Sequence, residues 1–401
     1  MGQILSEPIV DKKTSFEEDE NAAYCVSDMQ GWRISMEDAH TAVLNLTEEE
    51  GKTPLERISF FAVFDGHGGA NVARYSGRTV HTRLQELPEF KEKKWEASLR
   101  RAFLKTDEDL RQDPVYANDT SGCTAVAALL VPEAERKGPT IYVANAGDSR
   151  SVLSVGGEAK AMSYDHKPGN PDEHSRILNA GGFVEFDRVN GNLALSRAIG
   201  DFEFKQNSSL PAEKQIVTAD PEVIEHKWTG EEEFLVLACD GIWDCLTNQQ
   251  VVDIVRRGIA NGLELETITE DILDRCLAPD AEVGGIGCDN MTLMIVGLFG
   301  ERTKAEWYQW IKERVEGKVG YDTPETVPPV FRTHAQQGHH QHSFGSNAQR
   351  NVALSLNGLN GSDILSAIPR VLTGHGFQED ADIQEADKVT DEETKEAAEK
   401  A

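Results

Sequence analysis

Short apolar runs recur from about residue 24 to residue 299, and they constrain the fold of this chain more than any other feature. The runs are rich in β-branched and aromatic residues, which favour strands, and they are far shorter than a membrane span. They occur in clusters, and helical patterns do not alternate strictly with them. This favours an α+β layered fold over a doubly wound parallel sheet. We expect strands at 58–64, 124–131, 140–144, 151–155, 234–238 and 292–298.

Four segments carry apolar residues at the spacing of an amphipathic helix. Two of them follow the first of these strands, at 70–87 and 95–111. A third helix is expected at 249–257, where Thr247 is a candidate N-cap. The sequence "RTKAEWYQWIKERVEG" predicts one more helix, within 301–319.

The two ends of the chain differ in composition from the region between them. Residues 1–20 are polar and acidic, so we expect a flexible segment there, followed by a compact domain over 21–300. Residues 379–401 hold ten acids and three lysines. Such a segment cannot bury enough apolar surface to offset the loss of chain entropy. We therefore expect 320–401 to be mostly disordered, with 351–372 as an exception that can form a short helix or docking stretch.

The charge of the chain limits its partners. A formal net charge of −29 over 401 residues argues against general nucleic-acid binding, because the phosphate backbone would be repelled. A phosphorylated substrate would also be bound against the overall field, so local cations must attract it.

Two features of the sequence bear on location. Six scattered cysteines, without a CxxC pair or a signal peptide, predict reduced thiols in a cytoplasmic or nuclear protein. The N-terminal "MGQILS" fits the myristoylation pattern at Gly2, with Ser6 at the required position. A single acyl chain would give only weak, reversible membrane contact.

Acidic residues stand at the ends of the apolar runs and in one motif near the N-terminus. Each alone reads as a turn former or as surface charge. Together they indicate a shared site, because strands that end at one edge bring their terminal residues together. These acids are Glu37, Asp38, Asp65, Asp148, Asp240, Asp244 and Asp289.

Converging carboxylates require either a cation or a loss of charge. Two carboxylates ~4 Å apart repel by roughly 4 kcal/mol at an effective dielectric of ~20. No lysine lies within these motifs. No HExxH motif or cysteine pair accompanies them, which disfavours zinc, whereas oxygen ligands suit Mg²⁺ or Mn²⁺. Gly66, Gly68 and Gly69 would let the backbone turn tightly and bring a carbonyl within reach of an ion.

Two further residues allow two interpretations each. Arg33, close to Glu37 and Asp38, can hold a phosphate with both arms of its guanidinium or can neutralise its acidic neighbours. His67 can donate a proton or can cap the helix that follows it. The residues alone do not decide between the two interpretations of Arg33 or between the two of His67.

Eight motifs, spread over about residues 20–300, resemble those of a known protein family. In order they are "RISMEDAH", "FAVFDGHGG", "SGCTAVAALL", "VANAGDSRSVL", "DHKP", "GNLALSRAIGD", "LVLACDGIWD" and "GCDNMTLMIV". The chain resembles the metal-dependent serine/threonine protein phosphatases of type 2C, and most of all the fungal members. The resemblance implies a β-sandwich of two antiparallel sheets flanked by helices, with a metal-binding cleft at one end.

The resemblance also implies a metal-ligand set. Asp65 matches the carboxylate that bridges two ions. The Gly66 carbonyl and Glu37 would serve one ion, and Asp240 and Asp289 the other. The ions would be Mg²⁺ or Mn²⁺, and water between them would attack phosphorus without a protein nucleophile.

The other site residues match the family by position. Arg33 resembles the phosphate-binding arginine, His67 the general acid, and Asp38 an acid that holds a water at the metals. The stretch from about 166 to 192 corresponds to a flap that influences substrate choice. A weaker third ion would be held by Asp148, Asp240 and Asp244.

The resemblance implies a monomer that acts on phosphorylated proteins, with stress-activated or cell-cycle kinases as candidate substrates. The net charge predicts no nucleic-acid partner, and the short apolar runs predict no stable membrane insertion. Two other functions stay open at this point. The chain could be a non-catalytic adaptor with a phosphatase-like domain, or a metal-dependent nuclease or nucleotide hydrolase.

Overall fold

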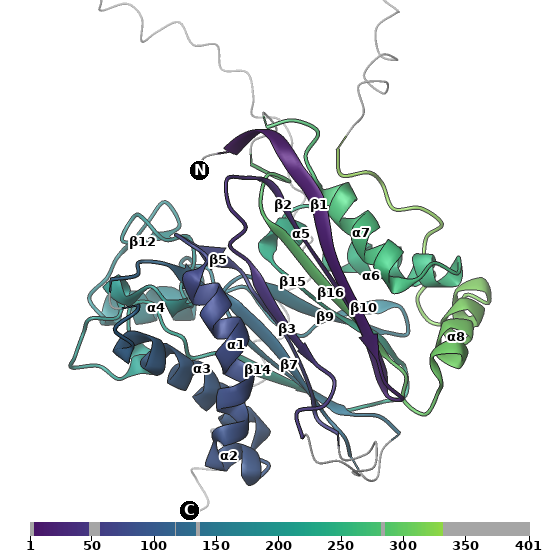
Figure 1. Cartoon of the computed structure of the whole chain (residues 1–401), viewed down its shortest axis with the longest axis horizontal. Helices are drawn as coiled ribbons and strands as arrows, with labels where there is room; N and C mark the ends of the chain where they lie inside the picture. The colour runs from purple at the N-terminus through teal and green to yellow at the C-terminus, as the bar shows by residue number, and fades with distance from the viewer. Residues whose placement is uncertain (1–3, 48–56, 117, 134–136, 282–284, 332–401) are drawn as a thin grey trace, which may run out of the picture. The chain divides into compact units, whose positions relative to one another are not determined.

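The structure of the protein is a computed structural model that describes residues 4–47, 57–116, 118–133, 137–281 and 285–331. Two antiparallel sheets form its centre (Figure 1). The six-stranded sheet has the order β1 (Ile4–Glu18), β2 (Ala22–Arg33), β16 (Met291–Leu298), β15 (Glu232–Ala238), β9 (Arg150–Val155), β10 (Glu158–Ala161). The five-stranded sheet has the order β14 (Glu222–His226), β8 (Thr140–Ala146), β7 (Ala125–Val131), β4 (Ser59–Phe64), β3 (Ala39–Val43).

Strand β4 shows why the apolar runs are continuous. Successive side chains of a strand point to opposite faces of its sheet. Phe61 and Val63 face the core between the two sheets. Phe60, Ala62 and Phe64 face the helices on the other side. Both faces of the strand are therefore buried, so no polar position interrupts it.

Helices cover the outer face of each sheet (Figure 1). The layers thus run helix, sheet, sheet, helix, and the predicted α+β sandwich is confirmed. The helices packed on the five-stranded sheet are α1 (Asn71–Glu86) and α3 (Trp95–Gln112). Those on the six-stranded sheet are α6 (Asn248–Ala260), α7 (Leu265–Cys276) and α8 (Lys304–Glu316). The shorter helices are α2 (Pro88–Lys91), α4 (Pro171–Asn179) and α5 (Asp240–Trp243).

The four helices predicted from periodicity are present as α1, α3, α6 and α8. The Thr247 side chain accepts a hydrogen bond from the backbone N–H of Gln250, and the Gln250 side chain accepts one from the Thr247 N–H. This reciprocal capping box fixes the start of α6 as predicted. Thr303 and Glu306 form the same box at the start of α8.

The prediction of a flexible segment over residues 1–20 is wrong, because Ile4–Glu18 form β1 at the edge of the six-stranded sheet. Edge strands tolerate polar residues, since one face and one row of backbone groups meet solvent. The inward-facing positions contact α7 and the core below it. Thr14 donates to Glu270 at 2.6 Å, Lys12 pairs with Asp274 at 2.7 Å, and Phe16 packs on the apolar core. Every second side chain from Lys12 to Phe16 thus faces inward, and the overall composition of the segment does not reveal this alternation.

The predicted disordered tail also begins too early. Residues 320–331 have defined contacts with the domain, and Thr323 among them is buried. Gly2, residues 332–401 and the stretch 351–372 lie outside the described residues, so the predictions for them stay predictions. None of the helices in the described part of the chain is long and apolar enough to cross a membrane.

Two small sheets lie beside the ends of the large ones. Three two-residue strands, β5 (Gly66–His67), β6 (Gly122–Cys123) and β13 (Ile199–Gly200), pair side by side. The hairpin of β11 (Val184–Glu185) and β12 (Arg188–Val189) follows α4. In the first of these sheets, β6 lies between β5, which follows β4, and β13, which precedes Asp201.

Candidate active site

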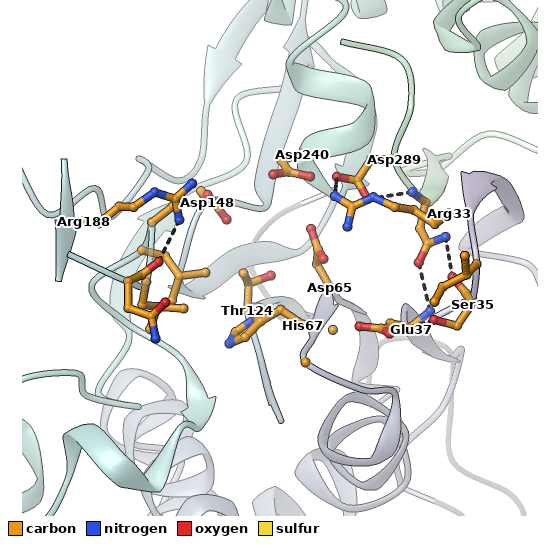
Figure 2. A pocket seen from close by; sticks show the side chains of 18 residues that line it. Arg33, Ser35, Glu37, Asp65, His67, Thr124, Asp148, Arg188, Asp240 and Asp289 are labelled. Carbon is orange, nitrogen blue, oxygen red and sulfur yellow. Dashed lines mark hydrogen bonds and ion pairs between the residues drawn. The ribbon is translucent and has the colours of Figure 1, made fainter. Parts of the chain in front are cut away.

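A cavity of about 420 Å³ opens where the predicted acidic residues meet. Figure 2 shows Asp65 in the middle of the group, with Asp240 and Asp289 beside one another near its carboxylate. The structure therefore brings together residues that lie more than two hundred positions apart in the sequence. Eight of the ten predicted site residues line the cavity: Arg33, Glu37, Asp65, Gly66, His67, Asp148, Asp240 and Asp289. Thr124, Arg188, Asn192 and Asn290 line it as well.

Each of the central acids sits at the end of a strand. Asp65 directly follows β4, and Asp148 lies in the turn between β8 and β9. Asp240 begins α5, two residues after β15, and Asp289 stands two residues before β16. The sheets are built by apolar burial, and their common edge places the carboxylates.

The carboxyl groups of Asp65 and Asp240 carry pKa values well above their usual range. Burial is the main cause for both. Asp65 is further affected by Asp240 and Asp38, and Asp240 by Asp148 and Asp289. Although these groups border a cavity, protein atoms surround them closely enough to remove much of their hydration. The arrangement favours either protons or a bound cation.

Asp38 lies behind the cavity wall and is 8% exposed. Its carboxylate accepts hydrogen bonds from Thr292 Oγ1 at 2.6 Å and from the Cys239 thiol. Burial raises the pKa of Asp38 to about 7. Carboxylate oxygens of Asp38 and Asp65 lie with Cys239 Sγ within 4.8 Å of one another.

The donor atoms of this group fit a hard divalent ion. Burial holds the pKa of the Cys239 thiol well above its usual value, so this sulfur stays protonated. The remaining donors are oxygens, which suit Mg²⁺ or Mn²⁺ better than softer metals.

Glu37 lines the cavity and is held there by two hydrogen bonds. Its Oε1 accepts from Ser35 Oγ at 2.7 Å, and its Oε2 accepts from the backbone N–H of Gly69 at 3.0 Å. A Cβ at Gly66 would lie 2.2 Å from the Glu37 carbonyl oxygen. Only glycine permits this approach, which places Gly66 and Glu37 side by side at the cavity.

Arg33 pairs with Asp289, and not with the acids next to it in the sequence (Figure 2). Its side chain is 39% exposed and lines the cavity. Of the two interpretations that the sequence left open, neutralisation of Glu37 or Asp38 finds no support in this pairing. A guanidinium at the cavity wall remains available to an anionic ligand.

A lysine reaches the acid cluster, contrary to the sequence-based expectation. Lys167 Nζ pairs with Asp148 Oδ2 at 2.5 Å. It also lowers the pKa of Asp240 and of Asp244, although burial dominates and keeps both raised. Lys167 comes from the "DHKP" motif, which is distant in sequence from each acid. Asp244 lies outside the cavity lining, so the predicted third-ion group is only partly exposed to the cavity.

His67 forms a dyad with Asp201, a residue to which the sequence analysis gave no role. His67 Nε2 and Asp201 Oδ2 are 2.7 Å apart, and Asp201 is buried. A Cβ at Gly122 would lie 2.2 Å from the Asp201 oxygen and 2.6 Å from the His67 nitrogen, so glycine leaves room for the pair. No side chain caps α1, which excludes the capping interpretation of His67. Burial lowers the pKa of His67, but Asp201 outweighs it and raises the pKa overall.

Comparison with known proteins places the fold and the cavity in context. The family described as "Protein phosphatase 2C" matches residues 22–283. The chain is 48% identical over 397 residues to "Protein phosphatase 2C homolog 2" of Hypocrea jecorina, which covers 97% of this chain and 88% of that protein. It is 52% identical over 324 residues to the protein of the same name in Schizosaccharomyces pombe, with 81% and 86% covered.

A solved structure agrees with these sequence matches. A phosphatase of Toxoplasma gondii shares the fold, with a TM-score of 0.60 and 27% sequence identity. The match covers 73% of this chain and 97% of that one. The fold, the acid-lined cavity and these matches define a protein serine/threonine phosphatase. The chain belongs to the protein phosphatase 2C family.

Proposed function

We propose that the chain hydrolyses phosphoserine and phosphothreonine in proteins at a centre of two divalent ions, Mg²⁺ or Mn²⁺, in the acid-lined cavity. One observation carries the proposal. Buried carboxylates converge at this cavity, and the charged groups that most affect Asp65 are all acids. A cation from solution would relieve this repulsion, which Arg33 and Lys167 relieve only at the edges of the group, at Asp289 and Asp148.

The ligand set is the one that the family resemblance implies, and its members at the two main ions all line the cavity. Asp65 would bridge the two ions, with Glu37 and the Gly66 carbonyl on one and with Asp240 and Asp289 on the other. A third, weaker ion would use Asp148, Asp240 and Asp244, in place of the Lys167 ammonium. When bound, the ions would supply an activated water and stabilise charge on the phosphoryl group.

The remaining residues would handle the substrate and its protons. Arg33 would hold the phosphoryl oxygens with two N–H groups. The imidazole of His67, oriented by Asp201, would donate a proton to the leaving serine or threonine oxygen. Asp38, with its raised pKa, would accept a hydrogen bond from the attacking water.

Although this chain is strongly acidic, its cavity carries local positive charge that suits a phosphorylated side chain of a substrate. Arg33 and Arg188 line opposite sides of it and supply local positive charge (Figure 2). The chain as a whole, with a formal net charge of −29, would repel nucleic acid. This supports a phosphoprotein substrate over a nuclease function.

The test uses the full chain, treated with EDTA and then titrated with Mn²⁺ or Mg²⁺. We expect hydrolysis of a phosphothreonine peptide to depend on the added ion, and we expect no cleavage of DNA. Binding of the peptide without turnover would identify a non-catalytic adaptor. Cleavage of DNA, or turnover in EDTA, would contradict the proposal.

The physiological role extends the same proposal. We propose a monomer in the cytoplasm and nucleus that reverses the action of stress-activated or cell-cycle kinases, with reversible membrane contact through a myristoylated Gly2. The resemblance to fungal members supports the choice of kinases. Phosphoproteomics after acute loss of the protein, compared with cells that carry Asp240→Asn, tests it. Sites that rise equally in both would be the substrates.

A further inference from the structure

The segment that follows α8 returns across the outer helices of the six-stranded sheet (Figure 1). We call residues 318–331 the return segment. It is anchored first by Arg256 of α6, which is completely buried. Arg256 donates to Tyr321 O and to Thr323 Oγ1, both at 2.7 Å, and to Val319 O at 3.2 Å. A buried guanidinium with these partners holds the backbone of the return segment firmly.

Further contacts carry the return segment along the helices. Arg257 donates to Thr323 O at 2.5 Å and to Pro324 O at 3.0 Å. Val327 and Val330 then pack against the core beneath α6 and α7. The path is therefore fixed by hydrogen bonds at its start and by apolar contacts toward its end.

Phe331 is the last residue of this path and packs on the segments that lead to Arg33 and Asp289. Its ring packs on a small cluster of buried residues formed by Trp32, Ala278 and Cys288. A Cβ at Gly287 would lie 2.6 Å from Phe331 Cζ, so the ring rests directly on the Gly287 backbone.

The residues under Phe331 flank two residues of the site. Trp32 precedes Arg33, and Cys288 precedes Asp289. The two segments are also tied to each other, because Trp32 Nε1 donates to Ala278 O at 3.0 Å and Ala278 N donates to Gly287 O at 2.9 Å.

Backbone contact completes this link. A Cβ at Gly31 would lie 2.7 Å from the Asp289 carbonyl oxygen, so β2 and the Asp289 backbone pack without space for a side chain. Phe331 thus covers the outer side of a small unit that holds both Arg33 and Asp289.

We propose that Phe331 is a positioning residue for the metal centre: it holds the Gly287–Asp289 backbone, and with it the Asp289 carboxylate, in the geometry that binds a divalent ion. The inference rests on the proposed function. Residues that orient metal ligands from outside typically change metal affinity by about 10- to 100-fold when they are removed. The return segment therefore links the C-terminal part of the domain to ion binding.

The test is calorimetric titration of Mn²⁺ into the metal-free full chain. We expect Phe331→Ala to weaken Mn²⁺ binding by about tenfold, the lower end of that range. Phe331→Leu keeps an apolar side chain on Gly287 and should bind Mn²⁺ more tightly than Phe331→Ala, closer to the wild-type affinity. Leu263→Ala, an apolar truncation at an exposed position between α6 and α7, serves as the matched control and should leave binding unchanged.

A second measurement separates positioning from general stability. The melting temperature of Phe331→Ala in EDTA should stay close to that of the wild type, because the affected unit is small. Wild-type affinity in Phe331→Ala would overturn the inference, and so would an equal loss in Leu263→Ala. Absence of Mn²⁺ binding in the wild type would instead refute the metal centre itself.

If Phe331→Ala does not fold, Arg257→Ala decides the question. This variant removes the two hydrogen bonds from Arg257 to Thr323 O and Pro324 O, which carry the return segment from its Arg256 anchor toward Phe331. Weaker Mn²⁺ binding supports the inference, and unchanged binding overturns it.

Discussion

Two groups of buried acids in this protein have opposite surroundings. Around Asp65, carboxylates face other carboxylates, and burial together with their mutual repulsion raises the pKa values. Around Glu173, a single buried carboxylate meets two guanidinium groups, Arg176 and Arg197, each at 2.7 Å, and the Ser196 hydroxyl. These partners outweigh burial and lower the pKa of Glu173 to about 2.

The difference separates a structural ion pair from a binding site. The Glu173 group is complete, because the chain itself supplies the opposite charge. The Asp65 group is incomplete: Arg33 and Lys167 reach its edges, where they pair with Asp289 and Asp148. A group that the chain leaves with excess negative charge is one that an ion from solution can complete. Exchanging a carboxylate for an amide in each group tests this contrast.

The largest effect is expected from Asp65→Asn on activity. The amide cannot bridge two cations, so hydrolysis of a phosphothreonine peptide in Mn²⁺ should fall by at least about 10²–10³-fold, the cost of losing one electrostatic group at a reacting centre. Steady-state kinetics of the full chain measure this. Asp11→Asn, at an exposed position of β1, is the control and should keep full activity. Wild-type turnover in Asp65→Asn would show that the cluster is not the catalytic centre.

The next effect is a loss of stability in Glu173→Gln. Removing the charge leaves two partly buried guanidinium groups without their partner, which costs up to about 3 kcal/mol. Urea unfolding should show this loss equally with and without Mn²⁺, since no ion completes this group. A loss that Mn²⁺ restores would mean that Glu173 belongs with the metal site, and the contrast would fail.

The sequence predicts the acids of the site better than their partners. Apolar runs that end in Asp65, Asp148 and Asp240 show from the sequence alone that carboxylates lie at strand ends, because strand length and polarity are local properties. Lys167 and Asp201 reach the site from loops. Their positions depend on how the loops fold back, which no local pattern records.

The same limit explains the errors at the two ends of the domain. β1 is polar because it is an edge strand, and only its pairing with β2 identifies it. The return segment is irregular, and its contacts, from Tyr321 to Arg256 and from Phe331 to Trp32, join residues far apart in the chain. Composition shows how many apolar side chains a segment has, but not which part of the domain those few side chains pack against.

The pH dependence of stability sharpens the comparison further. The pKa of Asp38 is raised to about 7 in the metal-free protein, so between about pH 4 and 7 the folded state keeps a proton that the unfolded state has released. Stability then falls as pH rises, by about 1.4 kcal/mol per pH unit for each such proton. Glu173, with its pKa lowered to about 2, contributes stability that is lost only in more acidic solution.

Scanning calorimetry from pH 5 to pH 7 measures this dependence, with EDTA and with saturating Mn²⁺. The gain in stability from Mn²⁺ should grow with pH, by on the order of 2 kcal/mol over this range. Burial lowers the pKa of His166 to about 4, which acts in the opposite direction, but His166 is present under both conditions and cancels from the difference. A gain that stays constant with pH would mean that protons and ions do not compete for the acid cluster.

The smallest expected effect is the change in melting temperature of Asp65→Asn in EDTA, and its sign tests the comparison most directly. In EDTA, Asp65→Asn should raise the melting temperature. In the wild type, Asp65 ionises freely only when the chain unfolds, and this ionisation favours the unfolded state. The amide has no such ionisation. We expect about 1 kcal/mol, or roughly 2 °C in a domain of more than 250 residues. Glu173→Gln must move the melting temperature in the opposite direction under the same conditions. If both variants lose stability in EDTA, then the acids around Asp65 are satisfied within the folded chain, and the argument that they require an external cation is wrong.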